Sequence, residues 1–300
     1  MPPCEGPKLR AFKHFKSDIS FIRLLSGDPD GPMSEDTGAM HSYVFEVRIC
    51  KQRYALKIFK FYYPDEERYG IGAPIQRNLS NETLAFHSDP FFAECRAYGR
   101  INQYYETIEN TNRRRPRRSR LKLRNASIKP IAVPCYGYIT LDAEYDTLLR
   151  KDFGIIDWDR SEQEDFGQIP KRPLRALVKQ LVSSEVSVAN PRRMLGDLRQ
   201  LRKLGIFQRD IYARNYKDGL LVDFSVAWTD PHWCLKALGP YQLGIEKGAD
   251  LRMFDEMIKR SGIKTVVRAT PDVEYCQKLR SRYVEESSYA SSNHSTNSDS

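Results

Sequence analysis

The stretch LGIFQRDIYARNYKDGLLVDFSVAW, from Leu204 to Trp228, holds a polar cluster between two short apolar runs. Asp210 and Asn215 lie in the polar part, and the second apolar run leads directly to Asp223. A tight hairpin between them would bring two carboxylates and one amide together. Carboxylate and amide oxygens suit a metal ion or a charged ligand, although the same residues are also common turn formers. The stretch therefore predicts either a polar site or an ordinary loop.

The composition is that of a globular protein. The chain has 300 residues, of which 40% are apolar and 11% aromatic, so it can form one large domain or two lobes with a substantial core. Lysine and arginine number 48 and the acidic residues 39, which gives a formal net charge of +9. This excess favours polyanionic partners such as nucleic acid, acidic proteins and nucleotides, without choosing among them.

The cysteines and the first residues of the chain predict an intracellular protein. The six cysteines are scattered, and none forms a C-x-x-C pair or lies at zinc-ligand spacing with a histidine, so we expect buried free thiols. Residues 1 to 15 contain no apolar signal core, and no apolar run is long enough to cross a bilayer. We therefore expect no contact with a membrane.

Two segments stand out as exposed. Residues 113 to 120 read RRRPRRSR, and so many like charges must be solvated, which predicts a basic insertion over 109–125. This run resembles a nuclear-localisation patch, but it can equally be a solvated insertion that contacts polyanions. The last fifteen residues, 286–300, contain seven serines and almost nothing apolar, so we expect a disordered tail after a fold that ends near Tyr283.

The residues from Ser42 to Tyr62 predict a β-hairpin. The sequence SYVFEVRICKQRYALKIFKFY alternates apolar and polar residues on both sides of a polar turn, and it is rich in β-branched and aromatic residues. Lys57 lies inside the second predicted strand, where a lysine usually faces solvent.

A long amphipathic helix is predicted after Asp89. Asp89 is a good N-cap and Pro90 suits the first helical position. Glu94 lies at the margin of the predicted buried face. That face consists of residues at helical spacing, namely Phe91, Cys95, Tyr98, Ile101, Tyr105 and Ile108.

The remainder of the chain predicts strands followed by helices. We expect one or two strands within 128–149 and amphipathic helices over 173–188, 191–204 and 248–262. Gly205 is well placed to end the second of these helices. The predicted order is therefore strands, helix, strands and helices, then the polar loop and a last helix.

Four short motifs resemble those of protein kinases. Residues 208–211 with Asn215 resemble the H-R-D-L-x-x-x-N catalytic loop, and residues 221–225 resemble the D-F-G segment. Residues 54–57 resemble V-A-I-K, and Glu94 falls on the helix where kinases carry the glutamate that pairs with that lysine. Each motif alone is weak, but the four occur in the kinase order over roughly residues 20 to 260.

The resemblance implies an atypical protein kinase-like fold of the α+β class. It would have two lobes: a β-rich N-lobe with one helix over 19–140, and a reduced, mainly helical C-lobe over 141–285. Residues 1–18 would be an N-terminal extension.

The resemblance also implies roles for five residues, with ATP and Mg²⁺ as the nucleotide and metal. Lys57 would neutralise the nucleotide phosphates and be held by Glu94 in a partly exposed ion pair, while Asn215 and Asp223 would hold the metal. Asp210 would accept the proton of an attacking hydroxyl.

The departures from the kinase pattern leave catalysis open. Gln208 replaces the motif histidine, Ser225 replaces the D-F-G glycine, and the segment 24–47 contains no G-x-G-x-x-G. No A-P-E motif follows Asp223, so we expect no peptide-substrate platform. Two functions therefore stand side by side: a phosphotransferase with an unidentified phosphoryl acceptor, and a catalytically inactive interaction module.

The motif stretches GIFQRDIYARNY and LLVDFSVAWTDPHW also resemble a set of filamentous-fungal kinase-like proteins that are catalogued with the kinetochore Sim4-complex subunit family. This resemblance implies protein partners and a nuclear or nucleocytoplasmic, centromere-associated role. The kinase-like motifs themselves carry no information about kinetochores.

Overall fold

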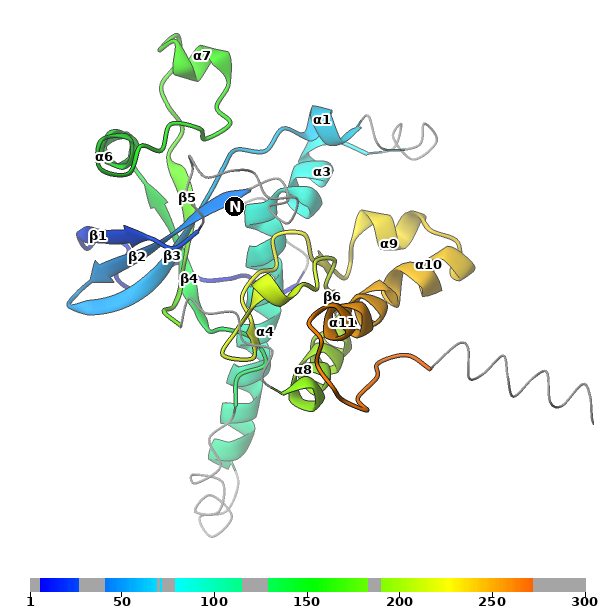
Figure 1. The fold of residues 1–300 in the computed structure, drawn as a ribbon. Helices are drawn as coiled ribbons and strands as arrows, with labels where there is room; N and C mark the ends of the chain where they lie inside the picture. The colour runs from blue at the N-terminus through cyan, green and yellow to red at the C-terminus, as the bar shows by residue number, and fades with distance from the viewer. Residues whose placement is uncertain are drawn as a thin grey trace, which may run out of the picture.

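The computed structural model has a sheet-rich N-terminal part and a mainly helical C-terminal part (Figure 1). One long helix, α4 (Pro90–Arg114), lies between the two parts. The structure describes residues 6–26, 41–68, 71, 79–114, 129–182 and 190–271.

Within the described residues, the sheet has five antiparallel strands in the order β1-β2-β3-β5-β4. The turn between β2 and β3 passes through Cys50 and Lys51, which both have positive φ angles, and it confirms the predicted hairpin. The strands are β1 (Ile19–Leu24), β2 (Ser42–Ile49), β3 (Gln52–Phe59), β4 (Cys135–Leu141) and β5 (Leu174–Gln180).

Helix α4 packs one face against the sheet, as its sequence predicted. It follows two shorter helices, α1 (Pro64–Arg68) and α3 (Asn81–Ser88). The Asp89 carboxylate accepts a hydrogen bond of 2.9 Å from the backbone N–H of Phe91, so the predicted cap is formed. The buried stripe of α4 comprises Phe91, Cys95, Tyr98 and Ile101.

The helix predicted over 173–188 is wrong, because residues 174–180 form β5. This strand lies between β3 and β4, and its residues Leu174, Ala176, Leu177 and Val178 are at most 1% exposed. A strand buried on both faces shows a continuous apolar run without alternation, and such a run cannot be distinguished from a buried helix by periodicity.

The region between β4 and β5 also differs from the prediction in part. The predicted strand is confirmed as β4, but the residues that follow form the helices α6 (Ala143–Phe153) and α7 (Glu162–Asp165). Since β5 completes the sheet, the sheet lobe extends to Gln180, whereas we expected it to end at residue 140.

The helical part confirms the two helices predicted on either side of the polar loop. These are α8 (Pro191–Lys203) and α11 (Ala249–Arg260), and Gly205 has a φ of 72° just after α8 ends. Short elements lie between them: β6 (Ile206–Phe207), η1 (Ala213–Asn215), β7 (Tyr216–Lys217), β8 (Leu220–Leu221), β9 (Trp228–Thr229), α9 (Trp233–Ala237) and α10 (Pro240–Lys247).

Two hydrophobic cores lie on opposite faces of the sheet. One joins the sheet to α4, α8 and α11, and Leu177 of β5 belongs to it. The other lies between the sheet and α6, where it includes Trp158 and Val178. The two faces of β5 thus contribute to different cores, which explains its unbroken apolar sequence.

The first described residues are part of the fold. Leu9 is buried in the core beside α4, and Phe12 is buried in the other core. Between them Ala11 pairs with Tyr138 in a parallel bridge, and the N–H of Phe12 donates to the Tyr138 carbonyl over 2.9 Å. The segment therefore covers the free edge of β4, which would otherwise expose unpaired backbone groups.

Several predictions concern residues outside those that the structure describes. Most of the basic run falls in 115–128, and the serine-rich tail falls in 272–300, so both stay predictions. Of the four cysteines described, Cys95 and Cys135 are buried as expected, whereas Cys50 is exposed. Within the described part, no helix is long and apolar enough to span a membrane.

Gly137 is the residue that allows the N-terminal segment to approach β4. Its φ is +141°, and a Cβ at this position would lie 2.7 Å from both the Arg10 carbonyl oxygen and the Phe12 nitrogen. We expect Gly137→Ala to lower the free energy of unfolding by about 3 kcal/mol, because the backbone is strained and the segment is displaced. Urea denaturation measures this loss, and trypsin should then cleave faster in the released segment.

The matched control is Gly196→Ala in α8, where nothing lies within 4 Å of an added Cβ. This variant should be neutral or stabilise the protein by up to about 1 kcal/mol, because alanine favours a helix interior over glycine. Equal stability of the two variants would show that the segment does not depend on Gly137.

Candidate functional site

Lys57 of β3 and Glu94 of α4 form a direct ion pair, as the sequence predicted. The distance from Lys57 Nζ to Glu94 Oε2 is 2.8 Å. The two residues are 37 positions apart in the chain, and they meet because α4 packs across the sheet.

This pair is buried, and the expectation of a partly exposed pair was wrong. The Lys57 side chain is 4% exposed and that of Glu94 is 0% exposed. Glu94 was placed at the margin of the helix's apolar face, but lysines of β3 and β5 both contact its carboxylate, so the sheet buries that margin. Because water does not reach either charge, removal of one partner leaves an uncompensated buried charge.

Asp223 joins the same cluster from the opposite side. Lys57 Nζ lies 2.7 Å from Asp223 Oδ1, and the backbone N–H of Ser225 donates to the same oxygen over 2.8 Å. Burial acts to raise the pKa of Asp223, but the charges of Lys57 and Lys179 outweigh it and hold that pKa well below its ordinary value. Asp223 is therefore ionised at neutral pH.

The same contacts shift the pKa of Lys57 upward. Burial acts to lower the pKa of this lysine, but the carboxylates of Asp223 and Glu94 raise it above its ordinary value. The lysine is therefore a fixed cation, and it is available as a partner for phosphate.

Lys179 of β5 is a second buried lysine of the site, and our reading of the sequence missed it. Its Nζ forms an ion pair with Glu94 and donates to the carbonyl oxygen of Val222 over 2.8 Å. Its side chain is 6% exposed. Had residues 174–180 been recognised as a strand, Lys179 would have shared a face with Leu177 and been directed toward α4.

We call these four residues the ion cluster: Lys57, Lys179, Glu94 and Asp223. It contains two cations and two anions, so it is neutral. Its members come from β3, β5, α4 and the segment after β8, which means that the cluster joins four separate elements.

Asp210 and Asn215 form a second polar group in the loop before β7. Asn215 Nδ2 donates to Asp210 Oδ2 over 2.7 Å and to the Asp210 carbonyl over 3.0 Å. Arg214 Nη2 donates to Asp210 Oδ1 over 3.0 Å. These bonds fix the orientation of the Asp210 carboxylate. Asp210 and Asn215, which could have been ordinary turn residues, thus hold each other in place by hydrogen bonds.

The β7-β8 hairpin links this group to the ion cluster. The N–H of Val222 donates to the Asn215 carbonyl over 2.9 Å, directly before Asp223. Gln208, which stands where kinases have a histidine, donates from Nε2 to the Asp223 carbonyl. The loop therefore holds the backbone around Asp223 through two hydrogen bonds. The five predicted site residues thus form two groups that these bonds connect: Lys57, Glu94 and Asp223 in one, and Asp210 and Asn215 in the other.

Phe224 anchors the D-F-S segment beneath α4. Its side chain is fully buried, and its ring packs edge to face on that of Tyr98 at a centroid distance of 5.2 Å. Tyr98 follows Glu94 by one helical turn, so α4 holds both Asp223, through Lys57, and its neighbour Phe224.

A cluster of histidines and aromatic rings attaches α4 and α3 to the segment after β9. The His232 ring stacks on Trp228 and contacts the His87 ring edge to face at 4.9 Å. Arg96 of α4 donates to the carbonyls of Thr229 and Pro231. Burial lowers the pKa of His232 to about 2, and the neighbouring His87 and Arg96 add to this effect.

Taken together, these contacts make the two-lobed, kinase-like α+β fold that the motifs predicted. The first lobe is β-rich: it contains the sheet, the helix α4 across it and the buried pair of Lys57 and Glu94. The second lobe is mainly helical. Among the described residues, no group of three or more histidine, cysteine, aspartate or glutamate side chains could hold a metal ion. A metal at this site would therefore need other ligands, such as the Asn215 amide, water or phosphate oxygens.

We expect the two lysines of the ion cluster to be energetically coupled. Lys57→Met or Lys179→Met alone leaves Glu94 with one cation, and each should lower the free energy of unfolding by about 2 kcal/mol. The double variant leaves Glu94 buried with no cation, so its loss should exceed the sum of the single losses. Urea denaturation of the four proteins measures the coupling.

Lys60→Met is the matched control for these variants. Lys60 pairs with Asp157, whose side chain is 59% exposed, so this substitution should cost less than about 1 kcal/mol. Strictly additive losses, or a Lys57→Met loss no larger than that of the control, would contradict the coupling.

Stability should also depend on pH through His232. An unfolded histidine has a pKa of 6.5 and the folded pKa is about 2, so the unfolded chain binds more protons below pH 6.5. The contribution of His232 should lower the free energy of unfolding by about 1 kcal/mol for each pH unit below 6.5. His232→Asn, which keeps an acceptor for the Cys234 N–H, should reduce the slope between pH 6.5 and 5.

The model of the family described as "Kinetochore Sim4 complex subunit FTA2" matches residues 1–108 and 119–228. Among curated proteins no match was found. Ten chains of solved structures match, among them "Structure of vaccinia related kinase 3", which is 10% identical with a TM-score of 0.37. That match covers 95% of this chain and 77% of the other.

Proposed function

The chain belongs to the kinetochore Sim4 complex subunit FTA2 family, and from this premise we propose that it is a kinase-like subunit that binds ATP with Mg²⁺ and transfers its terminal phosphoryl group. The observation that carries the proposal is the position of Lys57 between Glu94 and Asp223, at 2.8 Å and 2.7 Å. A protein that needed only a stable core would gain more from apolar side chains at these positions than from buried charges.

The chemistry of the site suits a nucleotide phosphate group. Lys57 is a buried cation whose pKa is raised by its carboxylate neighbours, so it remains charged when a phosphate displaces part of its contact with Asp223. Glu94 holds the lysine beside Asp223. The proposed role of Lys57 is to neutralise phosphate oxygens, with Glu94 as its positioning residue.

Asp223 and Asn215 fit a magnesium ion as oxygen donors. Among the described residues, Lys57 and Ser225 both contact Oδ1 of Asp223, which leaves Oδ2 for a metal. Asn215 donates from Nδ2 to Asp210, and this bond orients the amide so that Oδ1 can act as a ligand. A bound Mg²⁺ would neutralise charge on the phosphate oxygens.

Asp210 is the proposed acceptor of the proton in phosphoryl transfer. A hydroxyl oxygen of the acceptor forms a bond to the terminal phosphorus, and the bond to the bridging oxygen breaks with its electron pair on ADP. The hydroxyl proton passes to Asp210, whose carboxylate is oriented by Arg214 and Asn215. The acceptor is a molecule with a hydroxyl group, and the lack of an A-P-E motif after Asp223 favours a small molecule over a peptide.

A second function is favoured by two specific contacts. Gln208 donates to the carbonyl of Asp223, and Lys179 gives Glu94 a second cation. The charges of the site are therefore balanced without a nucleotide, as a non-catalytic interaction module would require. In either case, the family description supports a protein that works in the nucleus as part of a kinetochore assembly.

A thermal-shift titration distinguishes the two functions. ATP with Mg²⁺ at about 100 times its Kd should add about 2.7 kcal/mol to the free energy of unfolding, because only the native state binds it. For a chain of this size the melting temperature should rise by about 5 °C. EDTA should remove most of the shift, and Asp223→Asn should remove its metal-dependent part.

Asp165→Asn, a substitution of an exposed aspartate in α7, serves as the matched control and should keep the full shift. Shifts are compared with each variant's own ligand-free melting temperature, since Asp223→Asn also loses an ion pair. If ATP with Mg²⁺ leaves the melting temperature of the parent protein unchanged, the interaction module replaces the phosphotransferase.

A further inference from the structure

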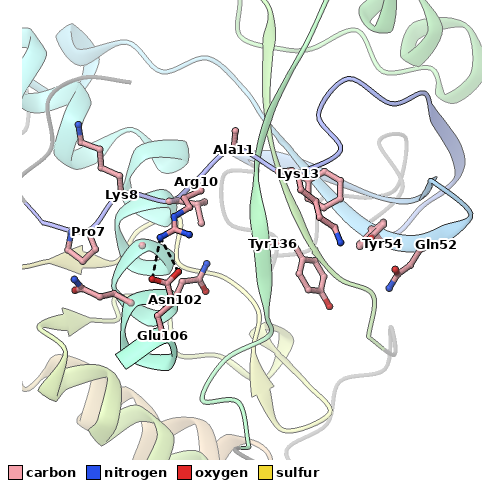
Figure 2. Close-up of a pocket in the computed structure, with 14 residues that line it drawn as sticks. Pro7, Lys8, Arg10, Ala11, Lys13, Gln52, Tyr54, Asn102, Glu106 and Tyr136 are labelled. Atoms are coloured by element: carbon pink, nitrogen blue, oxygen red, sulfur yellow. Dashed lines mark hydrogen bonds and ion pairs between the residues drawn. The ribbon is translucent and has the colours of Figure 1, made fainter. Parts of the chain in front are cut away.

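A groove of about 810 Å³ lies beside the N-terminal segment (Figure 2), and the four residues of the ion cluster do not line it. Its walls are residues 7–13, the outer face of the second half of α4, and the ends of β3 and β4. We call it the N-terminal groove. The side chains that give it its character are Lys8, Arg10, Lys13, Tyr54, Glu106 and Tyr136.

The walls of the N-terminal groove are held by the packing of the fold. Leu9 and Phe12, which are 3% and 1% exposed, anchor the segment in the two cores. The segment also lies directly on α4 at Gly99, where any added Cβ would collide with the Pro7 carbonyl. The exposed residues next to these anchors, Lys8, Arg10 and Lys13, are therefore presented from a fixed backbone.

The groove carries an excess of positive charge. Among the described residues that line it, Lys8, Arg10 and Lys13 are the cations and Glu106 is the carboxylate. Arg10 Nη2 already lies 3.3 Å from Glu106 in an exposed ion pair, as Figure 2 shows. Lys8 and Lys13 remain as charges that an acidic ligand could neutralise.

The other wall of the groove is aromatic. The Tyr54 and Tyr136 rings pack edge to face with their centroids 5.6 Å apart, and Tyr136 is 43% exposed. An exposed tyrosine on a rigid strand offers apolar contact area and a hydroxyl at small cost in side-chain entropy, which suits a binding surface.

We propose that the N-terminal groove binds an acidic peptide segment of a protein partner. Its excess of cations gives charge complementarity to carboxylates, and the amides of Gln52 and Gln103 lie where they can bond to a peptide backbone. A nucleic acid fits less well, because the carboxylate of Glu106 would face its phosphates. The family, described as a complex subunit, makes a protein partner the natural source of the segment.

This site is separate from the proposed nucleotide site. Glu94 lies on the buried face of α4, whereas Gln103 and Glu106 lie exposed on its outer face two to three turns later. The groove can therefore bind its partner whether or not the protein binds ATP, and the two proposals can fail independently.

The test uses the full chain and a fluorescein-labelled decaglutamate peptide, with binding followed by fluorescence anisotropy. The double variant Lys8→Glu/Lys13→Glu should bind at least about tenfold more weakly, because two attractive charges become repulsive. Binding by the parent protein should weaken as salt is raised. The matched control Lys151→Glu/Lys264→Glu carries the same change in net charge at exposed positions elsewhere and should bind within about twofold of the parent.

A third variant separates the groove from a diffuse charge effect. Gln103→Trp fills the groove without a change of charge, and it should weaken binding of the peptide by at least about fivefold through steric exclusion. All variants should melt within a few degrees of the parent, since the substituted side chains are exposed.

Four results would overturn the proposal. The parent protein could fail to bind decaglutamate, the charge control could lose as much affinity as the groove variant, or Gln103→Trp could bind normally. A 20-nucleotide single-stranded DNA could also bind more tightly than the peptide and be lost in Lys8→Glu/Lys13→Glu, which would make the groove a nucleic-acid site. The ATP-dependent thermal shift should be unchanged in every groove variant.

Discussion

The ion cluster, in which Lys57, Lys179 and Glu94 are buried and Asp223 is 28% exposed, is the constraint on which the rest of the structure depends. Its charges can be buried only as a neutral set, because a single unpaired charge in the interior costs several kcal/mol. Each partner comes from a different element, so the sheet, α4 and the segment after β8 must be in place together. The cluster thus sets the relative position of the elements that carry the proposed chemistry.

Helix α4 is the element that the sheet and the helical part share. Its buried face presents Glu94 to the cluster and Tyr98 to Phe224, while Arg96 donates to the backbone of β9. Its outer face forms a wall of the N-terminal groove. A helix fixed on several sides has little freedom to rotate, because any rotation would break a buried ion pair and uncover apolar surface at once.

The second lysine distinguishes this site from one that depends on the nucleotide for its charge balance. With Lys179 bonded to both Glu94 and the Val222 carbonyl, the glutamate is held even where Lys57 engages another partner. The same feature serves either proposed function. It could free Lys57 for phosphate, or it could keep a non-catalytic scaffold in one shape. The physical difference between the phosphotransferase and the interaction module is whether Asp223 and Asn215 bind a metal ion.

The sequence by itself determined the elements whose signals are local. The β2-β3 hairpin, α4 with its cap at Asp89, and the order of the polar motifs follow from alternation, helical spacing and turn chemistry. Only the tertiary structure decided that residues 174–180 form a strand, that Lys179 joins Glu94, and that Leu9 and Phe12 reach two different cores. A strand buried on both faces carries no periodic pattern, and contacts between distant segments arise from packing, which no local stretch encodes.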